Sequence, residues 1–69
     1  MARVLLGIKD INKQSDVDIV KRVLLTMHGV QSVQAGMDGQ AAVEYNGDEL
    51  TIMDLLRALR REGFVAGMV

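Results

Sequence analysis

The sequence contains no cysteine, and this absence removes several kinds of chemistry at once. Without thiols the chain has no disulfide, no thiolate metal ligand and no cysteine nucleophile. Aromatic residues are almost absent too: Tyr45 and Phe64 are the only two, so the core has to be built from aliphatic side chains. Basic and acidic residues nearly balance, with a formal net charge of −1 and no long run of one sign, and this balance points neither to nucleic acid nor to an anionic membrane.

Long apolar runs are also missing. The first apolar stretch ends at Lys9, which makes it too brief for the core of a signal peptide. No later stretch has the length needed to span a bilayer. We therefore expect a cytoplasmic protein that does not bind membranes.

What the chain does have is enough apolar material for one core. Hydrophobic residues make up 49% of its 69 residues, so disorder is not expected. A chain of this size buries only roughly 60% of its unfolded surface, which leaves a narrow stability margin. The sequence contains no linker or low-complexity segment, and we interpret residues 1–69 as a single domain.

Four stretches have the character of strands: residues 3–9, 30–35, 40–45 and 64–69. In the first, Val4, Leu6 and Ile8 alternate to one face. Leu5 is apolar on the other face, so we expect this strand to be covered partly on both sides. The turn at 36–39, with its Asp-Gly pair, predicts an antiparallel hairpin between the second and third strands.

Two amphipathic helices are predicted between the strands. The first has Ser15 as its N-cap and ends at His28-Gly29, and the second starts at Thr51 in a capping box with Asp54. Their apolar stripes are Val17, Val20, Leu24 and Met27 in the first, and Ile52, Leu55, Leu56 and Leu59 in the second. Met53 is also assigned to the core, and Leu25 to the surface.

The order is therefore β-α-β-β-α-β. Two right-handed β-α-β units folded together give a ferredoxin-like α+β sandwich, with a four-stranded antiparallel sheet and both helices on one face. In this topology the second and last strands form the edges of the sheet.

Beyond topology, three stretches resemble the heavy-metal-associated (HMA) domain, the family of small copper and mercury chaperones and of the N-terminal domains of metal-pumping ATPases. These stretches are Leu6-Gly7-Ile8-Lys9-Asp10-Ile11, Gly29-Val30-Gln31-Ser32-Val33 and residues 55–64, which end in Gly63-Phe64. Together they span nearly the whole chain. The resemblance implies a role in metal handling, transport or homeostasis, with a metal-transport protein as partner.

The family's metal ligands form a Cys-x-x-Cys motif, and gap-free counting from Gly29-Val30 puts Lys13 and Asp16 at those two positions. Ile11 replaces the methionine that supports the loop, and Phe64 matches a residue that packs beside it. A soft cation such as Cu(I) prefers sulfur, which an ammonium and a carboxylate do not provide. We therefore expect weak or no Cu(I) or Zn(II) binding, with Asp16 serving as a helix-start residue and Lys13 either pairing with it or remaining free.

Other metal ligands are scarce. His28 and Asp16 are weak candidates, because a single histidine makes a poor metal site. The five methionines do not converge in the sequence. The residues themselves predict no resident cofactor, and the family resemblance implies a metal ion as the alternative. An enzyme is not expected either, since the carboxylates are spread over helix starts and turns and the histidine has no evident partner.

A basic helical face is the candidate docking surface. It comprises Arg57, Arg60 and Arg61 of the second helix with Lys21 and Arg22 of the first. A solvated helix face would look the same, and the functional alternative is an acidic protein partner. Two further hypotheses stay open: an interaction module that self-associates, as a homodimer, through its edge strands, and a regulatory domain that senses a small molecule.

Overall fold

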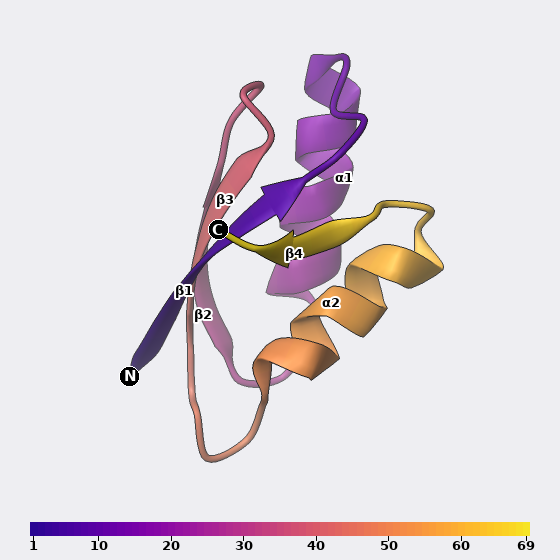
Figure 1. Ribbon diagram of the computed structural model, residues 1–69. Helices are drawn as coiled ribbons and strands as arrows, with labels where there is room; N and C mark the ends of the chain where they lie inside the picture. The colour runs from indigo at the N-terminus through magenta and orange to yellow at the C-terminus, as the bar shows by residue number, and fades with distance from the viewer.

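Alternating apolar residues build a four-stranded antiparallel sheet in the computed structural model, which describes residues 1–69 (Figure 1). The elements are β1 (Ala2–Ile8), α1 (Gln14–Leu25), β2 (Val30–Ala35), β3 (Gln40–Tyr45), α2 (Ile52–Arg61) and β4 (Ala66–Met68). The strand order is β2-β3-β1-β4, so β2 and β4 are the edges. The predicted ferredoxin-like fold is confirmed, and Figure 1 shows both helices on the same side of the sheet.

One face of the sheet and the two helices enclose the core. The buried apolar residues are Val4, Leu6 and Ile8 of β1, Ala41, Val43 and Tyr45 of β3, Val17, Val20 and Leu24 of α1, Leu55 and Leu59 of α2, and Phe64. Leu5 is 41% exposed on the opposite face. The expectation that β1 is covered on both sides is therefore wrong, because no element packs on that second face.

The start of α1 differs from the prediction. The helix begins at Gln14, with Lys13 as an N-cap residue that makes no side-chain capping bond. Ser15 lies inside the first turn and is exposed, so its assignment as N-cap is wrong. The side chain that serves this helix start is Asp16, which accepts a hydrogen bond from the backbone N–H of Asn12.

The end of α1 also comes earlier than predicted. The last helical residue is Leu25, and the Thr26 hydroxyl donates to the Val23 carbonyl at 2.8 Å. The chain then needs residues 26–29 to reverse direction before β2. Met27 therefore lies in this turn rather than on the helix, although it still packs against the core as expected.

The start and end of α2 have the motifs that the sequence predicted. Thr51 and Asp54 form a complete capping box. At the other end the Phe64 N–H bonds the Leu59 carbonyl and the Gly63 N–H bonds the Arg60 carbonyl, which is a Schellman motif with Gly63 at φ +89°. This motif turns Phe64 into the core. It uses Gly63 and Phe64, and the strand begins only at Ala66, so the prediction that it starts at Phe64 is wrong.

Met53 does not belong to the core. It is 55% exposed on α2, whereas Leu55 and Leu59 on the inner face are fully buried. Its assignment to the core is wrong because it lies on the flank of the helix that borders β4. Neither helix combines the length and the apolar composition that crossing a membrane would require.

Candidate functional site

The loop between β1 and α1 is fixed at its start by the backbone. The Lys9 N–H donates to the Val65 carbonyl at 2.9 Å, so the loop leaves the sheet beside the connection between α2 and β4. Asp10 follows with φ +66°, the only residue other than glycine with a positive φ. A glycine would suit this position better, because its backbone adopts the left-handed conformation without a steric penalty.

The apolar support under the loop is retained. Ile11 is half-buried and packs against the core cluster that contains Phe64. Phe64 itself is buried. The two residues assigned to loop support are therefore both attached to the same core, whether or not the loop serves a ligand.

At the two positions matched to metal ligands, the loop is closed by its own polar groups. The Asp16 carboxylate oxygen Oδ2 accepts the Asn12 N–H at 3.1 Å, and the Asp16 N–H donates to the Lys13 carbonyl at 3.0 Å. Lys13 is exposed and forms no ion pair with Asp16. An ammonium has no free lone pair and a carboxylate is a hard ligand, so this pair does not fit Cu(I).

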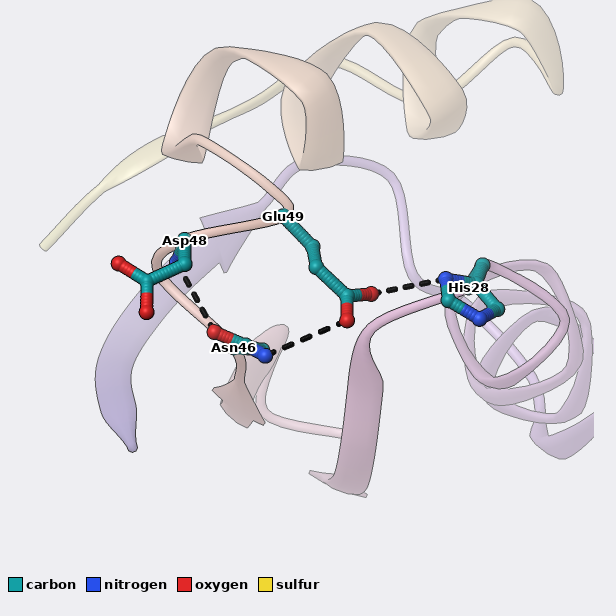
Figure 2. A network of polar contacts seen from close by, with 4 residues as sticks. All are labelled: His28, Asn46, Asp48 and Glu49. Carbon is teal, nitrogen blue, oxygen red and sulfur yellow. Dashed lines mark hydrogen bonds and ion pairs between the residues drawn. The ribbon is translucent and has the colours of Figure 1, made fainter.

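The other candidate ligand, His28, lies at the opposite end of α1, in the turn before β2. Figure 2 shows it facing the turn between β3 and α2, where its Nδ1 lies 2.8 Å from Oε2 of Glu49. Asn46 holds the other Glu49 oxygen at 3.3 Å and accepts the Asp48 N–H at 2.9 Å. The structure thus separates His28 from Asp16, and nowhere in the protein do three or more His, Cys, Asp or Glu side chains gather in a metal-binding geometry.

This contact between His28 and Glu49 was missed by the sequence analysis. The Asn46-Gly47-Asp48-Glu49 stretch predicted a turn, but not which distant turn it would meet. His28 is almost fully exposed, so the pair contributes little to stability. We interpret it as a surface contact between two turns, the one that joins α1 to β2 and the one that joins β3 to α2.

The candidate docking face consists of cations without ion-pair partners. The contact between His28 and Glu49 is the only one in the protein that brings a basic nitrogen within ion-pair distance of an acidic oxygen. No ion pair is therefore formed by the five cations of this face: Lys21, Arg22, Arg57, Arg60 and Arg61. All are exposed except Lys21, which is half-buried. The arginines therefore keep their full hydrogen-bonding capacity for groups outside the chain.

Two hollows border α2, one on each flank. The hollow toward α1, of about 400 Å³, is lined by Met27, Leu50, Asp54, Arg57, Ala58 and Arg61. The hollow toward β4, of about 300 Å³, is lined by Met53, Leu56, Arg57, Arg60, Phe64, Val65 and Ala66. Arg57 lines both, Arg60 only the β4 side and Arg61 only the α1 side. Sequence periodicity identified the arginines but not the hollows, which depend on how α2 sits against its neighbours.

No protein-family model matches the sequence, and no curated protein matches it either. Solved structures do match in shape. A copper-binding domain from the P-type ATPase HMA7 has a TM-score of 0.96 at 17% identity, covering 100% of this chain and 95% of that one. The CopZ metallochaperone has a TM-score of 0.90 at 18% identity, covering 96% and 100%.

A third structure, from work on crosstalk between Cu(I) and Zn(II) homeostasis, has a TM-score of 0.92 at 28% identity and covers both chains fully. The chain therefore has the fold of HMA domains, and the resemblance drawn from the sequence is confirmed at that level. It differs from the resembled motif in having no cysteine.

Proposed function

We propose that this protein is an HMA-like module that has lost the metal site and acts by docking on another protein through its basic helical face. The likeness in fold to copper-handling domains supports a role for this docking in metal transport or homeostasis. The observation that carries the proposal is the state of the loop, where Asp16 is engaged with the Asn12 N–H and Lys13 is a free ammonium.

The chemistry of these two groups supports the loss of metal binding. A Cu(I) site of the Cys-x-x-Cys type needs two soft ligands at this spacing, and the loop offers one hard carboxylate that already accepts a hydrogen bond. His28 lies at the other end of α1 and cannot complete a site with Asp16 inside one molecule. The protein also lacks the converging acid, base and nucleophile that an enzyme would need, so the proposed role is non-enzymatic.

The charge of the basic helical face supports the second part of the proposal, docking on another protein. Its five cations form no ion pairs within the chain, so a carboxylate-rich partner would not have to break any. Such a face steers an acidic partner into contact and raises the association rate at low ionic strength. Docking of this kind needs no metal between the two proteins.

Native mass spectrometry of the purified protein, with and without added Cu(I) and Zn(II), tests whether the metal site has been lost. We expect a metal-free species whose mass does not change with either ion. A stoichiometric complex with one ion would overturn the loss of metal binding. The same spectra report the oligomeric state, so a metal held between two chains would be seen as a metal-containing dimer.

A further inference from the structure

The hollow between α2 and β4 lies beside the free edge of the sheet, and the two together form one surface, which we call the α2–β4 groove. We propose that this groove binds an extended, acidic segment of a partner protein, which pairs with β4 and places an apolar side chain in the hollow. This inference rests on the proposed docking function and specifies where and what the protein docks.

The floor of the groove is apolar and accessible. Met53 is 55% exposed and Val65 60% exposed, and both line the hollow together with Leu56, Phe64 and Ala66. Burying exposed apolar surface gains roughly 25 cal/mol per Å². A hollow of about 300 Å³ has room for one or two apolar side chains of a partner. The floor therefore favours a segment that carries an aliphatic or aromatic residue.

The rim of the groove is cationic. Arg57 and Arg60 line the same hollow, and neither forms an ion pair with a carboxylate of this chain. Guanidinium groups bind carboxylates through paired hydrogen bonds. The charge complement of this rim is a segment with Asp or Glu beside its apolar residue.

The edge of β4 offers backbone groups for pairing. Lys9 bonds to Val65 and Val69 bonds to Leu5, so alternate residues of β4 face β1. The residues between them, Ala66 and Met68, therefore direct their N–H and C=O groups outward. An extended peptide can add to such an edge as a further strand.

The two edges of the sheet are not equivalent. The β2 edge carries a bulge between Val30 and Ser32, a feature that discourages edge pairing. β4 has no bulge and no charged residue within its three positions. Two features guard it: its length of three residues, and the neighbouring pair Arg57 and Arg60, which repels cations and attracts carboxylates.

This arrangement argues against a second copy as the occupant. A two-fold antiparallel pairing of β4 with itself, centred on Gly67, would place the two α2 helices side by side on the same face. The groove of one copy would then meet the groove of the other, with Arg57 and Arg60 from both copies facing like charges. A different, acidic chain avoids this repulsion.

The test begins with a random library of short peptides displayed on phage, selected against the immobilised full-length protein. We expect enriched peptides in which one aliphatic or aromatic residue is flanked by Asp or Glu. A selection that enriches no such sequence would overturn the inference. The synthetic form of an enriched peptide then serves as the probe for the variants.

Arg60→Glu and Arg61→Glu form a matched pair, because the residues are adjacent in the last turn of α2 and line opposite hollows. Both are exposed, so the two variants should unfold alike. We expect Arg60→Glu to weaken the peptide by about tenfold or more and Arg61→Glu by less than about threefold. Equal losses would mean that the basic face docks acidic chains without using this groove. No loss in either variant would contradict the docking function as well.

Amide hydrogen exchange followed by NMR tests the pairing with β4. Binding of the peptide should slow exchange at Ala66 and Met68, whose N–H groups face outward, and leave the Ser32 and Val33 region of β2 unchanged. In an added strand only alternate N–H groups of the peptide point toward β4. Two methylated peptides, one with the odd-numbered and one with the even-numbered backbone nitrogens methylated, should therefore differ, and only one of them should lose binding. Unchanged exchange at Ala66 and Met68 in a saturated complex would overturn strand addition.

Discussion

The carboxylate of Asp16 accepts a hydrogen bond of 3.1 Å from the backbone N–H of Asn12, four residues earlier. This bond ties the first turn of α1 to the loop that precedes it. Counting back from Gly29-Val30 predicts that the two cysteines of the resembled motif fall at positions 13 and 16. At these positions the chain closes the loop with its own hydrogen bonds. The loop does not need an ion for its shape.

Removing this carboxylate should destabilise the protein. Asp16→Ala loses a hydrogen bond to a charged acceptor and a favourable charge near the helix N-terminus, so we expect a loss of about 1 kcal/mol in the free energy of unfolding. Asp18→Ala is the control, because Asp18 accepts only from the Gln14 side chain. Urea denaturation compares the two, and an Asp16→Ala loss no larger than that of Asp18→Ala would contradict the role of this bond.

Substitutions at Asp10 test whether the backbone of the same loop needs its left-handed conformation at this residue. Its φ of +66° suits glycine and is unfavourable for a β-branched residue, so Asp10→Val should cost about 1–2 kcal/mol. Asp10→Gly should stay within about 1 kcal/mol of the wild type, since relief of strain and greater freedom of the unfolded chain oppose each other. Thermal unfolding of both variants measures the difference. Equal stabilities would show that residue 10 does not need the left-handed conformation.

Substitutions at Gly39 and Gly63 distinguish the cost of a steric clash from the cost of an unfavourable backbone conformation. Both have positive φ, but a Cβ at Gly39 would lie 2.7 Å from the Ile8 carbonyl oxygen, whereas a Cβ at Gly63 would meet nothing within 4 Å. Gly63→Ala should cost about 1 kcal/mol and Gly39→Ala at least about 1 kcal/mol more. Chemical denaturation of the two variants checks the order. The reverse order would mean that the turn at Gly39 is not held against β1.

The same substitution, leucine to alanine, at Leu59 and at Leu25 compares the stability cost in the core with the cost at the surface. Leu59 is fully buried and Leu25 is 50% exposed. Leu59→Ala should cost about 2–5 kcal/mol because it leaves a cavity, and Leu25→Ala under about 0.5 kcal/mol. In a chain of 69 residues the first loss is a large part of the total stability. Circular dichroism melts would contradict this assignment if Leu25→Ala were the more damaging change.

The fold was predictable from local signals that tertiary packing reinforces. The alternation of Val4, Leu6 and Ile8 predicted the buried face of β1, and Thr51 with Asp54 predicted the start of α2. These predictions were correct because each feature depends only on residues that are close together in the sequence. Gly63 predicted the end of α2 for the same reason.

The predictions were wrong where the structure of a residue depends on segments that are distant in the sequence. Ser15 is a good N-cap by composition, but the approach of the loop from β1 makes Lys13 the N-cap, two residues earlier, and the side chain that bonds to the loop is that of Asp16. Met53 is apolar, yet β4 is too short to cover that flank of α2, so it remains exposed. The α2–β4 groove follows from this short strand and was therefore not visible in the pattern of α2 alone.

A Cu(I) titration against a strong chelator, run on the wild type and on the Lys13→Cys/Asp16→Cys double variant, tests the account most directly. The scaffold is proposed to be intact and only the ligands missing, so the double variant should take one Cu(I) from the chelator while the wild type takes none. Each single variant should compete poorly, because one thiolate cannot make the two-ligand site. A wild-type protein that forms a one-to-one Cu(I) complex in this competition would contradict the central claim.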